Sequence, residues 1–436
     1  MSQPVFQELR KFIDGDGLCC VVKAPPGSGK SFNLLESLED AIESGKRIAI
    51  AAQTNNQIDD LCVRFCERCP ENEIYRFSSS GHNPSEVFPS GVVVVTDRKD
   101  LPQDGSVMIG TVAKLGHYDF ANPYDILLID EAWQMTWADF LTLRGISSRF
   151  ILIGDPGQIP PTVTISVDRW EVSPDAPHRA TPDVVLENPD LASDTTVLNL
   201  DVCRRLPYDS IALVQTFYDF EFEPLAKEGE RFLKSKKSSD GSTIDKAIDE
   251  LSASSTVILT HPTGVDGAPI ETDRELAQVT AKVVKRLLER GCTISTCPEE
   301  QEKPRKLTAE DIGIVSTHNQ MNTAIQNELP SELSMIQVMT PERWQGLERP
   351  VMIAIHPLSG VMFPSSFDLE TGRLCVMASR HKSACIFITR DHVGETLNIH
   401  LPIADQALGR SDIVGRGHSQ HTEFLRYHID RNLVIR

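Results

Sequence analysis

Short apolar runs, each followed by a polar turn, recur along the first half of the chain. Residues 18–23 (LCCVVK) are apolar with β-branched members, which predicts a buried parallel strand. After a polar stretch, apolar residues from Leu34 to Ile42 recur at helical spacing, and Gly45 ends the pattern. Two more apolar runs, within 124–129 and 150–154, predict buried strands that end in polar turns. This alternation predicts an α/β arrangement.

The polar stretch APPGSGKS at 24–31 matches the Walker A loop, with Ala24 in place of its first glycine. A methyl group there is tolerable if Ala24 keeps φ below zero. The two later glycines let backbone N–H groups surround phosphate oxygens, the lysine is expected to reach the β- and γ-phosphates of ATP, and the final serine to ligate magnesium. The predicted ATP-binding residues here are Pro26, Gly27, Ser28, Gly29, Lys30, Ser31 and Phe32.

The other two apolar runs end in residues suited to hydrolysis. ILLIDEAWQ puts Asp130 and Glu131 at the end of a strand, where a Walker B pair lies. Asp130 would hold magnesium through water, and Glu131 would polarise the attacking water as general base. GDPGQIPP at 154–161 carries Gln158, whose side-chain amide is expected to sense the γ-phosphate. Together these segments predict an ATP-hydrolysing site.

In this order APPGSGKS, TNNQIDDL at 54–61, Gly110-Thr111, DEAWQ and GDPGQIPP resemble motifs I, Ia, Ic, II and III of superfamily 1 helicases. TNNQIDDL is most similar to the 5′-to-3′ branch typified by the up-frameshift RNA helicase and its DNA-acting relatives. The resemblance implies two tandem RecA-like P-loop domains, with parallel sheets flanked by helices and ATP between them. It also implies nucleic-acid contacts by Thr54, Asn55 and Thr111. The family's adenine-reading glutamine falls near Gln3 and Gln7, of which Gln7 is slightly favoured.

Segments of the second half resemble the motifs that complete such a motor. LNLDVCRRLP at 198–207 resembles motif IV, which implies Arg204 as an arginine finger and leaves the role of Arg205 open. LCVMASRHK at 374–382 resembles motif VI and implies Arg380 as a second finger, although several residues of the usual motif differ; a plain surface arginine is the alternative. A guanidinium suits this task because it spreads charge over phosphoryl oxygens in the transition state.

Two more segments of the second half imply contacts with the ligands. VMTPERWQGLERP at 338–350 resembles motif V, which implies that Gln345 approaches the nucleic-acid backbone and that Glu348 contacts the ATP ribose. THNQMNTAI at 317–325 resembles a family segment that touches the strand through Thr317 and His318.

The domain boundaries follow from composition. Residues 162–196 are rich in proline and acids and are interpreted as an irregular connector, with packing through Trp170 as one option. It would separate a first RecA-like domain, 1–161, from a second, 197–436, with a C-terminal tail. In the second domain Thr272 and Glu275 have capping-box spacing ahead of a helix that Gly291 closes. The basic segment 234–243 is interpreted as a solvated loop, with a nucleic-acid contact left open.

Composition and charge limit which types of protein the chain can be. The chain has 436 residues, 40% hydrophobic and 24% charged, which is typical of a globular protein. A net charge of −19 argues against a broad basic surface, so nucleic acid is expected in a local channel. No signal peptide and no membrane-spanning run is evident, and we expect a cytoplasmic protein without a membrane partner. Cys62, Cys66 and Cys69 have spacing that could suggest a metal site, but their shared helix face favours burial. Trp133 and Trp344 could stack a base or pack in the core.

The leading hypothesis is an ATP-dependent helicase or translocase with ATP and magnesium as cofactors. It would act on single-stranded DNA or RNA as a monomer, with a loading or effector protein as a further candidate partner. Both nucleic acids stay open, because such motors hold mainly the phosphate backbone and stacked bases. The alternative is a nucleic-acid-stimulated ATPase that remodels a larger complex without processive unwinding. A scaffold without hydrolysis is disfavoured because Lys30, Asp130, Glu131 and Gln158 are all present.

Overall fold

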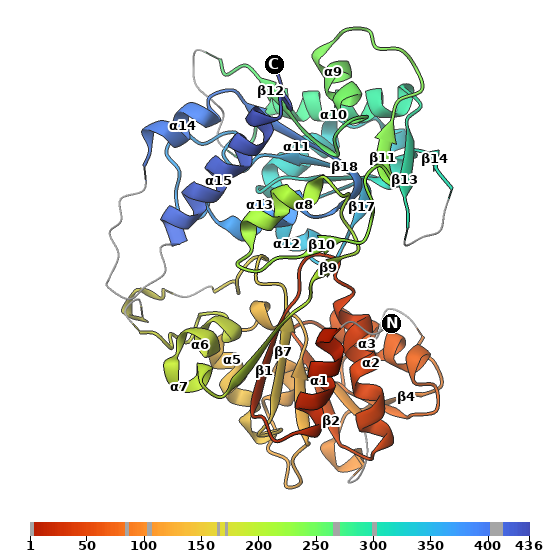
Figure 1. Ribbon diagram of the computed structural model, residues 1–436, viewed down its shortest axis with the longest axis vertical. Coiled ribbons are helices and arrows are strands. Elements are labelled where there is room, and N and C mark those ends of the chain that lie inside the picture. The colour runs from red at the N-terminus through yellow and green to blue at the C-terminus, as the bar shows by residue number, and fades with distance from the viewer. Residues whose placement is uncertain are drawn as a thin grey trace. The chain divides into compact units, whose positions relative to one another are not determined.

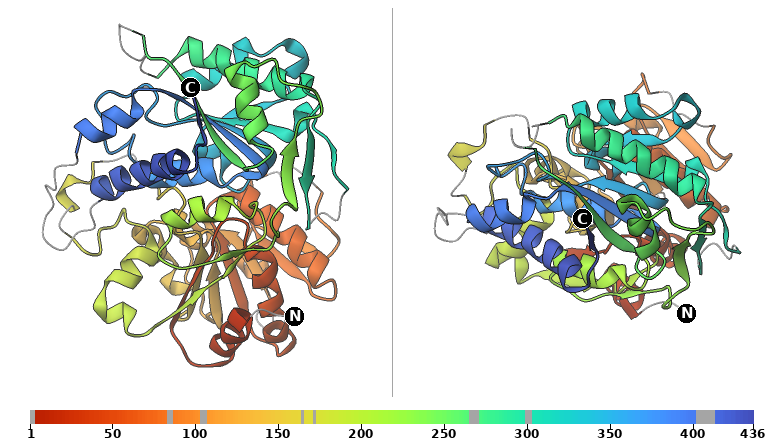
Figure 2. Two further views of the ribbon diagram at one scale, coloured as in Figure 1. Left: turned by 45° about the horizontal axis from the view of Figure 1, so that its top comes forward. Right: turned by 90° about the horizontal axis from the view of Figure 1, so that it is seen from above.

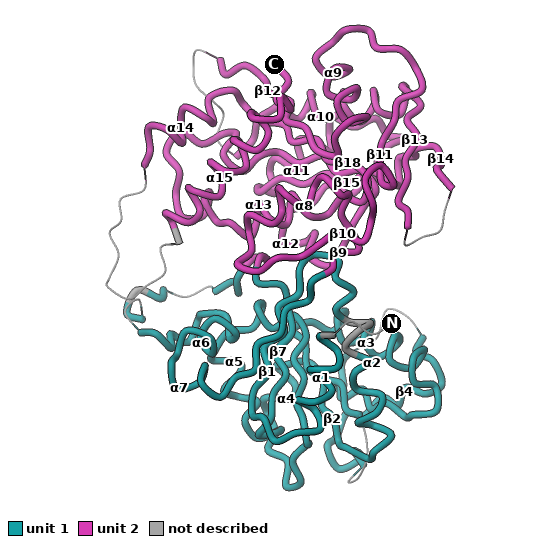
Figure 3. The backbone as a smooth tube through the Cα atoms, viewed as in Figure 1, with its two compact units in different colours: residues 1–156, 160–201 teal, residues 157–159, 202–436 magenta. Residues whose placement is uncertain are grey.

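The computed structural model describes residues 4–82, 87–102, 107–163, 166–170, 173–264, 271–298, 303–401 and 413–436. The chain forms two compact units (Figure 3). Unit 1 contains residues 1–156 and 160–201, and unit 2 contains residues 157–159 and 202–436. Each unit has its own sheet and core, and the two are described separately.

Unit 1 is built on an eight-stranded sheet in the order β4-β3-β5-β2-β6-β7-β1-β8, and every neighbouring pair is parallel. Four of its strands, β1, β2, β4 and β7, are labelled in Figure 1. The strands are β1 (Cys19–Lys23), β2 (Ile48–Ala52), β3 (Ile74–Phe77), β4 (Val92–Val95), β5 (Val107–Thr111), β6 (Ile126–Ile129), β7 (Phe150–Gly154) and β8 (Thr195–Asn199). The three apolar runs noted in the sequence are thus confirmed as β1, β6 and β7. They are adjacent in space in the order β6-β7-β1.

Helices cover both faces of this sheet because alternate strand residues point to opposite sides. One core joins Cys20, Val22 and Ile50 to the first three helices, and the other joins Val21 and Ala49 to helices from the second part of the unit. The helices are α1 (Pro4–Asp14), α2 (Lys30–Glu43), α3 (Asn55–Arg68), α4 (Val112–Leu115), α5 (Trp137–Thr142), α6 (Thr181–Glu187) and α7 (Pro189–Ala192). The helical pattern predicted after the Walker A loop is confirmed as α2.

Unit 2 contains a six-stranded sheet, again wholly parallel, in the order β16-β15-β17-β18-β12-β19. Its strands are β12 (Thr256–His261), β15 (Ile312–Val315), β16 (Gln337–Met339), β17 (Arg349–Ile355), β18 (His381–Arg390) and β19 (Val434–Ile435). Two smaller sheets accompany it: β9 (Val202–Cys203) with β10 (Glu223–Pro224), and β11 (Arg231–Lys234) with β13 (Thr293–Thr296) and β14 (Arg305–Lys306).

The helices of unit 2 also lie on both faces of its sheet, as the turned views show (Figure 2). One core contains residues of α9, α10 and α11, and the other contains residues of α8, α13 and α15. The helices are α8 (Ser210–Val214), α9 (Thr243–Glu250), α10 (Arg274–Glu289), α11 (Asn319–Glu328), α12 (Pro341–Trp344), α13 (Thr371–Ala378), α14 (Val393–Ile399) and α15 (Ile413–Asp430). Two units of parallel sheet flanked by helices confirm the predicted α/β class with tandem RecA-like domains.

The structure draws the boundary between the units elsewhere than the sequence suggested. In the expected irregular connector 162–196, α6, α7 and the start of β8 are regular, and β8 pairs with β1 in the sheet of unit 1. The chain passes into unit 2 between Asp201 and Val202 rather than at 161 and 197. Proline suggested irregularity, but Pro182 and Pro189 lie in the first turns of α6 and α7. There the missing N–H costs nothing, because it would have no partner within the helix.

One predicted helix start is wrong by one residue. The N-cap of α10 is Asp273, whose carboxylate accepts from the backbone N–H of Leu276, and not Thr272. The hydroxyl of Thr272 donates instead to Gln320 on α11. Aspartate and threonine are both good caps, so spacing to Glu275 could not separate them. In the described parts of the chain, no helix combines the length and apolar character that crossing a membrane requires.

Candidate functional site

The carboxyl ends of parallel strands meet at one edge of a sheet, and in unit 1 this edge carries the predicted motifs. The Walker A loop follows β1, the DEAWQ segment follows β6, and GDPGQ begins at the end of β7, the strand between them. The segments resembling motifs Ia and Ic follow β2 and end β5 at the same edge. Residues far apart in the sequence thus gather along one edge.

The loop between β1 and α2 has the backbone that phosphate binding requires. Gly27 and Gly29 have φ of 65° and 73°, a left-handed region that costs glycine nothing. Gly29 is also the N-cap of α2, so free N–H groups of the first turn lie at the loop. Ala24 is buried, its N–H donates to the carbonyl of Gly154 at 2.8 Å, and its φ is not positive. The condition that the sequence set for Ala24 is therefore met.

Lys30 and the two acids of DEAWQ lie together at this edge. The Nζ of Lys30 is 2.8 Å from Asp130 Oδ1 and 2.7 Å from Glu131 Oε1. Burial alone would lower the pKa of Lys30, but the two carboxylates outweigh it and raise the pKa above its usual range. The ammonium is therefore charged at neutral pH. The fold thus brings together three residues that the sequence singled out, and their roles in ATP binding and hydrolysis remain predictions.

Glu131 has the environment of a base rather than of a solvated surface acid. Burial raises the pKa of its carboxyl, Lys30 opposes that rise, and Asp130 and Asp155 add to it. Its φ is 52°, a strained value for a residue with a side chain, and its N–H donates to Asp130 Oδ1 at 2.9 Å. A carboxyl whose proton affinity is raised accepts a proton from water more readily.

Asp130 fits the requirements of a divalent cation. It is 5% exposed, and a carboxylate oxygen is the ligand that magnesium prefers. Magnesium at such sites keeps several waters and takes other oxygens from substrate phosphates, so a large protein cage is not needed. Within the described residues, no group of three or more His, Cys, Asp or Glu side chains could hold a metal by itself. The side chains of Ser31 and Phe32 lie outside the described set, and so does Gln3.

Gln158 lies on the segment after β7 that belongs to unit 2. Its backbone carbonyl approaches Gly372 of α13 so closely that a Cβ at Gly372 would be only 2.6 Å from that oxygen. The predicted role of Gln158 at the γ-phosphate stays a prediction. Gln7 is exposed on α1, and its adenine contact also stays a prediction.

The residues predicted to touch nucleic acid in unit 1 also hold the local structure. Thr54 caps α3 in a capping box with Gln57, and the Thr111 hydroxyl accepts from the N–H of Lys114 at 3.2 Å. The side-chain oxygen of Asn55 accepts from Arg76 at 2.8 Å. Their backbones are therefore rigidly placed at the carboxyl edge, and their strand contacts remain predictions.

In unit 2 the predicted ATP-facing residues gather at the opposite, amino edge of the sheet. Glu348 precedes β17, and one oxygen is 2.5 Å from Arg205 Nε and the other 2.7 Å from Lys382 Nζ. Burial would raise the pKa of Glu348, but these two cations lower it to about 2. Arg205 is thus held in an ion pair, whereas the guanidinium of Arg204 is half-buried and has no partner in the described stretches of the chain. This contrast favours Arg204 over Arg205 as the finger.

Arg380 lies between α13 and β18 and is 1% exposed. Its carbonyl accepts from the N–H of Arg349 at 3.0 Å, which ties the end of the motif VI segment to the start of β17. The plain surface arginine considered as an alternative does not fit this burial. Gln345, predicted to approach the nucleic-acid backbone, is half-buried at the end of α12, just before the left-handed Gly346. The finger role of Arg380 and the strand contact of Gln345 remain predictions.

The two tryptophans and the cysteines of α3, for which the sequence allowed either a binding role or core packing, are packed in the core. Trp344 is fully buried, and its indole N–H donates to the carbonyl of Ile314 at 2.9 Å. Trp133 is 4% exposed and donates to Asp183 at 2.8 Å. Cys62 and Cys66 pack with Phe65 in the core of unit 1, and burial raises the pKa of the Cys62 thiol to about 12. Neither tryptophan presents a face to a base.

Part of the chain is similar in sequence to known proteins. A family model described as an AAA domain matches residues 94–166, which span the segments resembling motifs Ic, II and III. The DNA replication ATP-dependent helicase/nuclease DNA2 of Saccharomyces cerevisiae is 25% identical over 146 residues, or 32% of this chain and 10% of that protein. The DNA replication ATP-dependent helicase/nuclease JHS1 of Arabidopsis thaliana is 26% identical over 144 residues, or 32% and 11%. This third of the chain is thus similar in sequence to ATP-dependent helicase/nucleases.

Solved structures similar to this chain include two viral helicases. Arterivirus nonstructural protein 10 (helicase) is 13% identical, covers 91% of this chain and 63% of its own, and has a TM-score of 0.45. The PRRSV helicase is 14% identical, covers 88% and 55%, and has a TM-score of 0.43. The match to the curated relatives spans only about a tenth of their length.

Several residues of the candidate site are not evident from the sequence. Gln57 on α3 donates from Nε2 to Gln134 Oε1 at 3.3 Å, which joins the motif Ia helix to the DEAWQ segment. Asp155, buried after β7, contributes to the raised pKa of Glu131, and Lys382 completes the pair of cations on Glu348. Asp155 could have been found by its place directly after a buried strand. The other three lack a local signal, because their partners are distant in sequence.

Proposed function

We propose that this chain is a superfamily 1 helicase, an ATP-driven translocase that moves along single-stranded nucleic acid and separates strands. The observation that carries the proposal is the grouping of Lys30, Asp130 and Glu131 beside the Walker A loop. A lysine that leaves the two acids for the β- and γ-phosphates would free Glu131 to orient and deprotonate water. The raised pKa of Glu131 supports that role.

The substrate on this proposal is ATP, held by the N–H groups at the start of α2 and by Lys30. Magnesium, when bound at Asp130 with the Ser31 hydroxyl, would neutralise charge on the β- and γ-phosphates. Arg204 and Arg380 would supply positive charge to the transferring phosphoryl group from the second domain. Hydrolysis split between two domains can drive alternate tightening of their grips on a strand.

The resemblance of TNNQIDDL supports 5′-to-3′ movement, and the acidic composition supports binding in a local channel rather than on a broad surface. A monomer in the cytoplasm, loaded by a partner protein, is the working expectation for the molecule.

A second candidate function is a remodelling ATPase without processive unwinding. The short segments between motifs favour it, since the described residues between α3 and β5 form only the short strands β3 and β4 and one 3-10 turn at Arg98–Asp100. The two candidates differ in whether hydrolysis opens a duplex.

The test is ATP turnover without polynucleotide, with single-stranded DNA and with single-stranded RNA, next to unwinding of a tailed duplex. Translocation predicts turnover stimulated by at least one single strand and lost in Lys30→Ala, with opening of a 5′-tailed duplex. Stimulation without opening would favour the remodeller. No turnover under any condition would refute both.

A further inference from the structure

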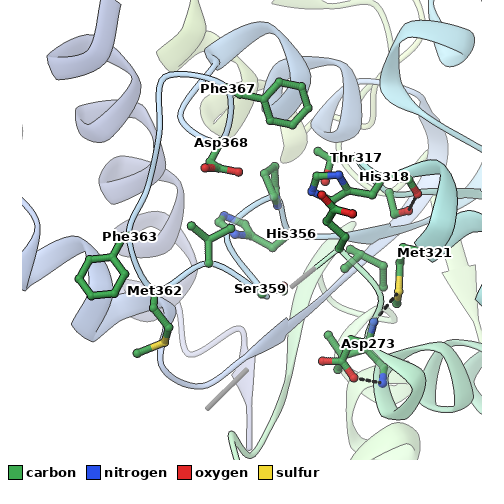
Figure 4. Close-up of a pocket in the computed structure, with 17 residues that line it drawn as sticks. Asp273, Thr317, His318, Met321, His356, Ser359, Met362, Phe363, Phe367 and Asp368 are labelled. Atoms are coloured by element: carbon green, nitrogen blue, oxygen red, sulfur yellow. Dashed lines mark hydrogen bonds between the residues drawn. The ribbon is translucent and has the colours of Figure 1, made fainter. Parts of the chain in front are cut away.

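Unit 2 contains a cavity of about 360 Å³ at the carboxyl edge of its sheet (Figure 4). It lies where the adjacent strands β15 and β17 end. From β15 the chain continues through α11 to β16 on one side, and from β17 through α13 to β18 on the other. Crevices at such a switch in strand order are where open parallel sheets bind ligands. The volume is within the range of about 300–1,000 Å³ typical of small-molecule sites.

The cavity has aromatic and apolar walls suited to a flat ring. The rings of His318 and Phe367 are 5.8 Å apart with an angle of 34° between their planes, and Figure 4 shows both on the same side of the cavity as Asp368. Phe363 and Met362 also line the cavity and are 79% and 43% exposed. Large exposed apolar side chains gathered at a cavity are typical of a binding surface rather than of a core.

The charge of the lining disfavours a phosphate group. Asp273, Glu271 and Asp368 all line the cavity, and the lining includes no lysine or arginine. The carboxylate of Asp273 is satisfied by Arg390, which donates to both of its oxygens at 2.7 and 2.8 Å. One oxygen of Asp368 accepts from the N–H and hydroxyl of Ser365. Its other oxygen has no hydrogen-bond partner in the part of the chain that is described, so it can accept from a ligand.

Two histidines supply further polar groups to the cavity. Burial lowers the pKa of His356 far below its usual value, so this imidazole is neutral in the folded protein. The ring of His318 lies tilted against that of Phe367, and His318 caps α11 without a side-chain bond to the helix. The guanidinium of Arg373 lies over the Phe367 ring at 4.0 Å, but Arg373 is not among the lining residues. The combination of aromatic rings, an accepting carboxylate and no lysine or arginine in the lining fits an uncharged heteroaromatic ring with N–H donors.

We propose that this cavity takes one unstacked nucleobase of the bound strand and prefers bases that carry an amino group. The proposal rests on the proposed function and deepens it by assigning base recognition to a motor whose grip is otherwise on the backbone. Stacking on His318 and Phe367 would hold any base, since every base has a π-face. Asp368 would accept from the amino group of cytosine or adenine. Thymine and uracil present carbonyl oxygens beside their single N–H donor, and these oxygens are repelled by a carboxylate.

The experiment measures affinities of the full chain for labelled single strands of oligo-dC, oligo-dA and oligo-dT by fluorescence anisotropy. Wild-type protein is expected to bind the first two at least about fivefold more tightly than oligo-dT. Asp368→Asn should remove most of that preference, because an amide can pair with thymine as well. Asp430→Asn makes the same charge change on the exposed end of α15 and should leave the ratios unchanged. Ratios do not depend on the fraction of protein that is folded.

A second variant tests stacking. Phe367→Leu should weaken binding of every base-containing strand about fivefold, and should leave binding of an abasic strand unchanged. Equal affinities for the three strands, with ratios unaffected by Asp368→Asn, would overturn the base pocket and leave the motor intact. Binding to no strand at all would refute the proposed function itself, and the pocket with it.

Discussion

Replacing Gln134 with methionine is expected to weaken the link between nucleic-acid binding and the nucleotide site within unit 1. The side-chain Nε2 of Gln57 donates to Gln134 Oε1 at 3.3 Å, and Oε1 of Gln57 accepts from the N–H of Thr54 at 3.0 Å. The N–H of Gln134 donates to the carbonyl of Glu131 at 2.8 Å. One side-chain amide thus connects the segment predicted to touch the strand to the turn that carries the general base. Methionine has similar length and removes the amide without touching the capping box of α3.

The magnitude follows from one partly buried neutral hydrogen bond. Such a bond contributes about 0.5–1.5 kcal/mol, which corresponds to a factor of about 2 to 13 in an equilibrium constant. Coupling is reciprocal, so a non-hydrolysable ATP analogue should change strand affinity in wild-type protein more than in Gln134→Met, by up to this factor. Affinity for the analogue alone should stay unchanged, because Lys30 and the Walker A loop are intact.

The assay is a strand titration with and without the analogue for wild type, Gln134→Met, Gln57→Met and the double variant. Gln57→Met also loses the cap, so its unfolding is followed in parallel. The double variant should lose no more coupling than the worse single variant, because both changes remove the same bond. The reasoning would be refuted if the losses of coupling in the two single variants added up in the double variant. It would also be refuted if the analogue changed the strand affinity of Gln134→Met as much as that of the wild type.

Three further outcomes follow from individual contacts. Arg204→Ala and Arg380→Ala should each lose ATP turnover with little loss of ATP affinity. Arg205→Ala should mainly lower the melting temperature, because it breaks the ion pair with Glu348. An unchanged kcat in the first two variants would show that neither arginine acts as a finger. Burial lowers the pKa of His421 to about 3 in the folded protein. As the pH falls below about 6.5, this histidine is protonated in the unfolded chain but not in the folded one, so the free energy of unfolding decreases. His421→Leu should therefore lose about 1 kcal/mol less than wild type between pH 7 and 5.5 in urea unfolding, and equal losses would contradict this. Trp344→Phe should cost about 1–3 kcal/mol of stability, because it removes one buried hydrogen bond and leaves a gap in the core, without weakening strand binding. A loss of strand affinity at equal stability would instead indicate base stacking.

The sequence predicted the nucleotide site well because its signals are local. The β1 strand, the Walker A loop and α2 are consecutive, and the apolar run before Asp130 could only be a buried strand. The parallel sheet then placed Lys30 beside Asp130 and Glu131 without further information.

What the sequence could not predict depends on contacts between distant segments. The pairing of β8 with β1 joins residues about 175 positions apart along the chain. The boundary between the two units near Asp201 therefore could not be predicted from the residues around it. The cavity at β15 and β17 is assembled from four separate segments, and the ion pair of Arg205 with Glu348 spans 143 positions. Trp344 beside a conspicuous motif was equally consistent with stacking and with packing until its burial was known.

Hydrolysis by Glu131→Gln, measured together with ATP binding, tests the central claim most directly. The account holds that Lys30 and the Walker A loop bind ATP and that the raised proton affinity of Glu131 makes it the base. The amide keeps the size of the side chain and loses the ability to take a proton. We predict retained ATP binding and a fall in turnover of at least about a hundredfold, with or without single strand. Turnover at the wild-type rate would contradict the account.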